Sequence, residues 1–466
     1  MKFLKIIFIF FLLLNINYAD RPQQDEFSST SWFSSDNIST FVCPDSSFSA
    51  ISNVLLSADR SIDIMVYEFW SREIYKIIDN VTSKGVRVRV LLEKDTYSDY
   101  GTQWNMNISN MLYELKQEGR PVEIRLEQSD NFMHAKIMII DESIVILGSE
   151  NYMPTSFPKN PNNIELRPYT TASRGWGVVI RDSDFARECL DVFESIYEQS
   201  EDYNPNKHGV GSAPYYSGKL SYIPKVATFS ETNVDVMLLK TPGNSLEMIK
   251  WMINHANYTI LIEQMYIKSA DSSVSELLNA LKNARKRGVT IQIIVEDDSI
   301  GNYNEVKSTL ISMGFHVVPA FKYCNALFLH NKGLIVDDYL VLVGSINWSG
   351  AALSSNTELG VVVKSRSIAR FFREAFALDW NYSSSSPFDS DGDGLSNFFE
   401  IEHGFDPYKK DSDGDGISDY DEVYLYGNVN TFSSTTLEPE NNTTIIILVT
   451  LVVVSVVMIT IIWLYS

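Results

Sequence analysis

Cysteine, basic residues and histidine are all scarce in this chain, and each scarcity narrows what the protein can be. The three cysteines in 466 residues, Cys43, Cys189 and Cys324, allow at most one intrachain disulfide, so the fold does not depend on a disulfide framework. Lysine and arginine number 38 against 59 aspartates and glutamates, which gives a net charge of −21 at pH 7. Residues 383–444 hold 14 acidic and 2 basic residues, which leaves −9 for the rest of the chain. No Lys- or Arg-rich stripe marks a nucleic-acid-binding face.

Long apolar runs are absent except at the two ends of the chain. Residues 1–19 are predicted to be a secretory signal peptide, because Lys2 and Lys5 precede an apolar stretch and Ala19 ends a typical cleavage site; a linker at 20–40 follows. Residues 445–464 are apolar and uncharged over the length of a bilayer span, which predicts a transmembrane anchor. A GPI-anchor signal is the alternative, because small residues at 433–435 precede the tail and no Lys or Arg follows it.

Either anchor puts the body of the protein outside the cytoplasm, at the extracellular face of the cell membrane or at a lumenal membrane. N-x-Ser/Thr sequons are compatible with glycosylation in that setting. They are headed by Asn37, Asn80, Asn107, Asn257, Asn381, Asn441 and Asn442.

One sequence pattern occurs twice. A His-x-Lys pair is followed after four residues by Asp and after six more by Gly-Ser-x-Asn, with the same spacing in both copies. The first copy consists of His134, Lys136, Asp141, Gly148, Ser149 and Asn151, and the second of His330, Lys332, Asp337, Gly344, Ser345 and Asn347. The chain has only six histidines. Two of them in matched contexts therefore indicate a catalytic pair rather than two ordinary core side chains.

The chemistry of this pattern suits a phosphate diester. Each motif opens an apolar, strand-like run, 136–141 or 332–337, so its His and Lys lie on one face of the strand. Lys supplies a point charge with three donors and Asn supplies two more, which stabilise charge that develops on the non-bridging oxygens. One His can attack phosphorus to form a phosphohistidine, while the other protonates the leaving oxygen and then activates water or an alcohol.

The paired motifs resemble the signature of the phospholipase D superfamily, and the chain is duplicated around them. Residues 58–67 match 256–265, and residues 84–93 match 287–296. Strands alternate with helical stretches in each half, which predicts an α/β fold. The resemblance implies two tandem phospholipase D-like α/β halves with mixed sheets, packed about a pseudo-twofold around one shared active site. The predicted halves span residues 41–200 and 229–382, with a linker at 201–228. The resemblance also implies a monomer, since the chain contains its own pseudo-dimer.

The same resemblance implies roles for the motif residues. His134 is expected to be the nucleophile and His330 the general acid and base, with no metal needed for catalysis. Asp141 and Asp337 would orient the imidazole rings or hold the lysines. The serines Ser149 and Ser345 would support the site.

The two halves differ after the second part of the motif. In the family, a glutamate after the second motif often steadies the catalytic His of the opposite half, and Glu358 stands at that position. In the first half Trp176 stands where the equivalent glutamate is expected, which breaks the symmetry. The proline-containing stretch 152–175 is either a lid that shapes the substrate site or a tolerated surface insertion.

An acidic module at 387–427 follows the second half and leads into a stalk at 428–444. The pattern D-x-D-x-D-G-x5-E occurs twice in it, 22 residues apart, and supplies the alternating oxygen ligands that Ca²⁺ requires. The predicted Ca²⁺ ligands are Asp389, Asp391, Asp393 and Glu400 in the first copy and Asp411, Asp413, Asp415 and Glu422 in the second. The module resembles thrombospondin type 3 repeats, which implies a structural calcium-binding segment; an unstructured acidic spacer is the alternative.

Three functions compete. The leading hypothesis is a phospholipase D-type hydrolase or transphosphatidylase acting on membrane phospholipids, which the anchor would place beside its substrate. The tyrosines near the predicted linker either line an acyl groove or pack in the ordinary way; they are Tyr203, Tyr215, Tyr216 and Tyr222. The alternative is a nuclease that cleaves nucleic-acid phosphodiesters. The third is an inactive, calcium-stabilised surface protein, against which the complete His, Lys and Asn sets of both motifs argue.

Overall fold

The computed structural model describes residues 32–166, 171–213, 218–220, 225–296, 303–320, 327–385, 405, 409–412 and 416–424. The chain divides into two compact units, residues 1–383 and 384–466. The predicted signal peptide, the apolar segment 445–464, residues 433–435 and six of the eight predicted calcium ligands lie outside the described residues. Among the helices that the structure describes, none is both long and apolar enough to cross a bilayer.

The first half alternates strands and helices. Its elements are β1 (Phe33–Cys43), α2 (Ser47–Leu56), β2 (Ser61–Val66), α3 (Arg72–Ser83), β3 (Arg87–Glu93), α4 (Asp99–Gln117), β4 (Val122–Glu127), β5 (Lys136–Ile140), β6 (Ile144–Gly148), β7 (Ile164–Leu166), β8 (Ala172–Arg181), α5 (Ser183–Tyr197), β9 (Glu201–Asp202), α6 (Pro205–His208) and β10 (Gly218–Leu220). Helix α3 shows why these segments are helical: Ser71 caps it by accepting the N–H of Ile74, and its apolar residues recur on one buried face.

The second half repeats this order. Its elements are β11 (Phe229–Thr241), α7 (Ser245–His255), β12 (Thr259–Gln264), α8 (Ser272–Lys286), β13 (Thr290–Val295), α9 (Tyr303–Ser312), β14 (His316–Pro319), β15 (Leu327–Leu329), β16 (Lys332–Val336), β17 (Leu340–Gly344), α10 (Gly350–Ser354), β18 (Glu358–Lys364) and α11 (Arg366–Ser385). In the second unit the structure describes the short helix α13 (Asp419–Tyr424).

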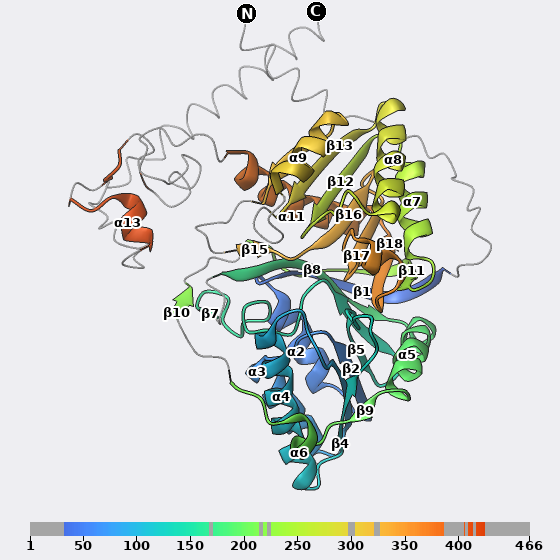
Figure 1. The fold of residues 1–466 in the computed structure, drawn as a ribbon, viewed down its shortest axis with the longest axis vertical. Coiled ribbons are helices and arrows are strands. Elements are labelled where there is room, and N and C mark those ends of the chain that lie inside the picture. Colours follow the sequence, from blue (N-terminus) through green and yellow to red (C-terminus); the bar gives the residue numbers. More distant parts are fainter. Residues whose placement is uncertain are drawn as a thin grey trace, which may run out of the picture. The chain divides into compact units, whose positions relative to one another are not determined.

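Both halves contribute to one mixed sheet. Its strand order is β14-β13-β12-β16-β17-β18-β11-β1-β8-β6-β5-β2-β3-β4-β9, with β15 pairing with β8 beside this path. Counted outward from the antiparallel β1–β11 pair, equivalent strands follow in the same order on both sides. The prediction of two tandem α/β halves with mixed sheets is confirmed. Figure 1 shows the second half above the first, with β8 along the boundary between them.

The core has three parts. One apolar cluster lies under α2, α3 and α4 in the first half, and its counterpart lies under α7, α8 and α9 in the second. A third cluster joins the halves: Ile137 and Val178 share it with Val341, Val361 and Phe372. Because burial of apolar surface is the dominant favourable contribution to folding, this shared cluster fixes the position of one half on the other.

The predicted boundary of the first half is wrong. Residues 20–40 were assigned to a linker, but β1 begins at Phe33 and pairs with β8 on one side and β11 on the other. This strand is therefore the central seam of the sheet. Its alternation of apolar residues with Ser, Thr and Asn is weak, which is why the sequence pattern did not reveal it.

Tyr203 is the one linker tyrosine among the described residues, and it packs rather than lining a groove. Its side chain is buried against Tyr113 and His208, and its hydroxyl donates to the carbonyl of Gly209 at 2.6 Å. Tyr215, Tyr216 and Tyr222 lie outside the described residues, and so does Cys324. Cys43 and Cys189 are free and buried.

Candidate active site

Each motif histidine is held by the opposite half of the chain. The N–H of His134 donates to the carbonyl of Thr357 at 2.8 Å, and the N–H of His330 donates to the carbonyl of Arg174 at 2.9 Å. A parallel bridge joins Met133 to Thr357, and β15 pairs with β8 in the equivalent way. The two motifs therefore enter one site from opposite halves of the sheet, as the resemblance implied.

A glutamate at the end of a neighbouring strand fixes the backbone just before each histidine. Glu93 accepts the N–H of Met133 at 2.8 Å, and Glu296 accepts the N–H of Leu329 at 2.8 Å. Burial raises the pKa of Glu93 to about 8. Sequence reasoning assigned these glutamates no role, although they fall at matched positions of the internal repeat and so carried a usable signal.

The motif lysines are buried and point at their own histidines' backbone. Lys136 Nζ donates to the carbonyl of His134 at 2.6 Å, and Lys332 Nζ donates to that of His330. Both lysines are almost fully buried, at 1% and 0% exposure. Burial lowers the pKa of Lys136 to about 8, and that of Lys332 falls well below its ordinary value for the same reason. These ammonium groups are strong electrostatic partners for an arriving anion.

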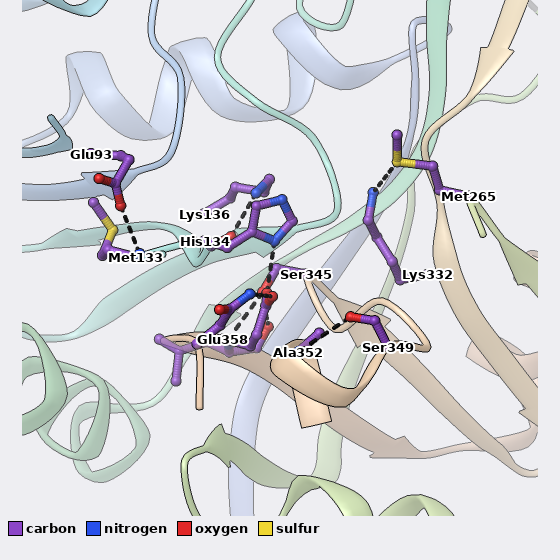
Figure 2. A network of polar contacts seen from close by, with 12 residues as sticks. Glu93, Met133, His134, Lys136, Met265, Lys332, Ser345, Ser349, Ala352 and Glu358 are labelled. Carbon is purple, nitrogen blue, oxygen red and sulfur yellow. Dashed lines mark hydrogen bonds and ion pairs between the residues drawn. The ribbon is translucent and has the colours of Figure 1, made fainter. Parts of the chain in front are cut away.

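Figure 2 shows the His134 ring between Lys136 and the carboxylate of Glu358, with Lys332 on the far side of the site. His134 Nδ1 lies 2.9 Å from Glu358 Oε2, at hydrogen-bond distance. Ser345 Oγ donates to the same carboxylate oxygen. The placement of Glu358 against the His of the other half is therefore confirmed.

The two imidazole rings are neutral over most of the pH range. Burial lowers the pKa of His134 to about 4, against the opposing pull of Glu358, and it lowers the pKa of His330 to about 4 as well. The charge of Lys332 lowers the pKa of His134, and that of Lys136 lowers the pKa of His330. Each lysine thus acts on the histidine of the opposite motif, so the four groups form one cluster. The rings keep 13% and 12% of their side chains exposed, which leaves an edge open to substrate.

The motif asparagines lie at the site but are not matched in their contacts. Asn151 Nδ2 donates to Glu68 at 3.0 Å, and burial raises the pKa of Glu68 to about 7. Asn347 is buried as well, and the Oδ1 atoms of both asparagines have no hydrogen-bond partner among the described residues. The partnerless atom is an acceptor in both asparagines, whereas a phosphate oxygen would need the Nδ2 donor.

Asp141 and Asp337 do not belong to the site, and the role predicted for them is wrong. Asp141 lies after β5, at the end opposite to His134, and its carboxylate accepts the backbone N–H groups of residues 59, 60 and 61. Asp337 binds the N–H groups of residues 257, 258 and 259 in the same way. Burial alone would raise the pKa of Asp141, but these three donors outweigh it and hold that pKa below its ordinary value. Four strand residues separate each aspartate from its lysine, so the aspartate fastens a loop at the far end of the strand and does not contact an imidazole ring.

The first six residues of the stretch 152–175 form neither a lid nor a surface insertion. Tyr152, Met153 and Phe157 are buried, and the carbonyl of Tyr152 accepts the N–H groups of Trp70 and Ser71. This segment is part of the first half's core. For residues 152–157 both alternatives are wrong, because buried aromatic residues among prolines and asparagines do not follow a helical or strand period.

Glu150 is a further site residue that the sequence analysis did not identify. It occupies the variable position of Gly-Ser-x-Asn in the first motif, where the second motif has Ile346. Its Oε2 lies 3.6 Å from His330 Nδ1, an ion-pair distance that is too long for a hydrogen bond. Burial alone would raise the pKa of Glu150, but His330, Lys332 and the hydroxyl of Ser156 together hold it below its ordinary value. Each motif histidine therefore faces a carboxylate.

Of the predicted calcium ligands, the structure describes Asp411 and Glu422. Asp411 accepts the N–H of Gly416 at 2.8 Å, and Gly416 has a φ of +94°, a conformation that favours glycine. Such a tight turn is what the D-x-D-x-D-G loop needs to wrap oxygen ligands around an ion. Within the described ranges, no group of three or more His, Cys, Asp or Glu side chains is arranged to hold a metal ion.

Comparisons with known proteins match both modules. The family described as cardiolipin synthase, PLD-like domain, matches residues 51–197 and 249–380, and the family described as bacterial TSP3 repeat matches residues 389–410 and 411–427. Human mitochondrial cardiolipin hydrolase is 27% identical over 164 residues, which are 35% of this chain and 55% of that protein. The chain thus spans about half the length of that relative.

Other relatives cover more of the chain. Cardiolipin synthase A of Wigglesworthia glossinidia brevipalpis is 23% identical over 373 residues, 76% of this chain and 69% of that protein. Among solved structures, phosphatidylserine synthase from Haemophilus influenzae Rd KW20 superposes with a TM-score of 0.51 at 13% identity, over 76% of this chain and 88% of that one. The last similarity supports the two-half fold.

Replacing Asp141 by Ala is expected to lower stability without changing the chemistry. The carboxylate accepts three backbone N–H groups, and their loss should cost roughly 2–3 kcal/mol of unfolding free energy. Urea denaturation would measure the loss. Turnover of a soluble phosphodiester per folded molecule should stay within twofold of the parent. Glu142→Gly is the control, because it changes the same turn at a positive φ and leaves the carboxylate in place. A collapse of turnover in fully folded Asp141→Ala would contradict this assignment.

Proposed function

The chain belongs to the phospholipase D superfamily and is a phosphodiesterase of that superfamily; from this premise we propose that it hydrolyses or transfers phospholipid phosphodiesters through a phosphohistidine at an extracytoplasmic membrane surface. The observation that carries the proposal is the cluster described above. Two neutral imidazoles, each facing a carboxylate from the opposite half, share a site with two buried lysines. That set has the parts needed for two-step transfer at phosphorus.

His134 is the better placed nucleophile. Its Nδ1 faces the Glu358 carboxylate at hydrogen-bond distance, so the ring proton sits on Nδ1 and Nε2 keeps its lone pair. In the first step Nε2 forms a bond to phosphorus as the bond to the leaving oxygen breaks, and His330 gives its proton to that oxygen. In the second step His330 takes a proton from water or an alcohol, whose oxygen attacks phosphorus and releases His134. The lysines stabilise the charge on the non-bridging oxygens.

Exposed aromatic residues near His134 favour a lipid substrate over a nucleic acid. Tyr97, Tyr100 and Phe132 are 92%, 68% and 37% exposed. The ring of Tyr67 connects Phe132 and Tyr97 to the site. Its centroid lies 5.6 Å from that of the Phe132 ring and 4.9 Å from that of the His134 ring, and its hydroxyl accepts the N–H of Tyr97. Tyrosines combine an apolar ring with a polar tip and suit the boundary between lipid and water. The net charge of −9 outside residues 383–444 does not suit a polyanion.

The remaining parts of the proposal concern place and stability. The predicted signal peptide and the C-terminal anchor, transmembrane or GPI, would hold the enzyme beside its lipid. In the segment 387–427 the alternating carboxylates would hold Ca²⁺, and Asp411 with Gly416 has the tight turn that such a loop requires. Bound calcium would neutralise the crowded carboxylates of the segment and stiffen it. Its removal should affect this segment and not the chemistry, since the predicted ligands lie outside the first unit.

The decisive measurement compares substrates in parallel. The full chain would be assayed on vesicles of phosphatidylcholine, phosphatidylglycerol and cardiolipin and on single-stranded DNA. We expect head-group or phosphatidate release from lipid, lost by more than about a thousandfold in His134→Ala and in His330→Ala, because each variant lacks one of the two proton or phosphoryl carriers. Release of nucleotides instead would replace the lipid proposal by a nuclease. Full activity of either variant would overturn the two-histidine mechanism.

The pH dependence should lie on the acid side. The reaction needs one histidine neutral and the other protonated, and burial lowers both pKa values to about 4. The form with one proton on the pair is therefore most populated near pH 4 and becomes about tenfold rarer with each pH unit above that. We expect kcat/KM to be highest at acid pH and to fall towards neutrality. A kcat/KM profile that peaks at pH 7 or above would contradict these pKa directions.

A further inference from the structure

The register of the sheet identifies the residue that corresponds to Glu358 in the first half. Gly148 pairs with Gly177 just as Gly344 pairs with Gly360. The N–H of Trp176 donates to Ser149 Oγ at 3.2 Å, and the N–H of Leu359 donates to Ser345 Oγ at 3.1 Å. Trp176 therefore corresponds to Leu359, not to Glu358. The residue at the place of Glu358 is Gly175, which has no side chain.

The space next to Gly175 is filled by the side chain of Glu150. A Cβ placed on Gly175 would lie 2.2 Å from Glu150 Oε1, 2.9 Å from its Cδ and 2.3 Å from Ser149 Oγ, a terminal hydroxyl that can rotate away. The carboxylate of Glu150 thus occupies the position at which a side chain from β8 would begin. Glu150 is 2% exposed and Glu358 is 0% exposed, so both carboxylates lie in equally dry surroundings.

The segment that follows the motif holds Glu150 by Oε2, the carboxylate oxygen that also faces His330. Ser156 Oγ donates to Glu150 Oε2 at 2.9 Å. Ser156 is fixed in turn, because its carbonyl accepts the hydroxyl of Ser47 at 2.6 Å and its N–H donates to the carbonyl of Met153. Ser345 has the same relation to Glu358 in the second half. Each carboxylate therefore has one serine partner and one histidine.

We propose that Glu150 is the positioning residue of His330, and that the carboxylate has moved from β8 to the Gly-Ser-x-Asn loop in exchange for a glycine at 175. The inference rests on the proposed two-histidine function. Glu150 sets the ring orientation of His330 and stabilises its imidazolium form, which carries the proton destined for the leaving oxygen. Because Gly175 and Glu150 share one volume, a carboxylate can enter from either position but not from both.

The test is an exchange of the two positions. Glu150→Ile gives the first motif the residue that the second has at Ile346, and should lower kcat by about a hundredfold with little change in KM. Gly175→Glu alone should be poorly active and less stable, since its Cβ would lie 2.2 Å from Glu150 Oε1. Glu150→Ile combined with Gly175→Glu should recover at least a tenth of the parent kcat. Each single change then impairs the enzyme and the pair restores it.

Two further measurements separate positioning from a structural role. The pKa of His330, followed by NMR of labelled histidine, should fall in Glu150→Ile and return in the double variant, because only a nearby carboxylate favours the charged ring. Glu150→Asp should keep part of the kcat. The assays use bis(p-nitrophenyl) phosphate, with His330→Ala as the baseline, so that a failure of the lipid proposal does not affect them. The NMR titration does not need turnover and remains decisive if the soluble diester is not cleaved.

The outcomes are distinct. Full activity of Glu150→Ile, or an unshifted His330 pKa in that variant, would overturn the proposal. A folded double variant with the melting temperature of the parent but no more activity than Glu150→Ile would also overturn it. A kcat and a His330 pKa that fall and recover together would establish the exchange.

Discussion

The site depends on keeping two lysines charged in a place that water barely reaches. Lys136 and Lys332 are at most 1% exposed, and burial of an ammonium group without compensation costs several kcal/mol. Their compensation comes from Glu358 and Glu150, whose charges raise the pKa of both lysines against the effect of burial, and from Glu68, which also raises that of Lys136. Two ammonium groups with two carboxylates form a nearly balanced set. An anionic diester then finds preorganised positive charge without further desolvation of the site.

This balance explains why the two halves must interlock. Each carboxylate is supplied by the half opposite to the histidine that it faces, and each histidine's N–H is bound by a carbonyl of that opposite half. Neither half alone supplies both glutamates that raise the pKa of its lysine, or the carboxylate that its histidine faces. The apolar cluster shared by β5, β8, β17 and β18 carries the two halves together, so the packing of the core and the electrostatics of the site impose the same arrangement.

The sequence predicted the features that occur in both halves, and it did not predict contacts between residues far apart in the chain. Paired motifs at equal spacing predicted the two halves, the shared site and the contact of Glu358 with His134. The role predicted for Asp141 and Asp337 was wrong because the motif places them close to the histidines in sequence. It does not show that they lie at the opposite end of the strand. Asp141 binds amides 80 to 82 residues away in the sequence, a contact that no local pattern contains. The start of β1 was missed for a similar reason, since its partners β8 and β11 are far along the chain.

The case of Glu150 shows what a duplicated site retains. The register of the sheet places Gly175 at the position of Glu358, so β8 offers no carboxylate to His330. In space the carboxylates are equivalent, because the electrostatic requirement is a negative charge beside the Nδ1 side of each imidazole, whatever backbone position supplies it. The buried segment that begins at Tyr152 also supports the Glu150 carboxylate. A glutamate on a loop lacks the support that strand β18 gives to Glu358, and Ser156, fixed by Ser47, provides that support from the added residues. The longer connection in the first half is thus part of the active site's construction.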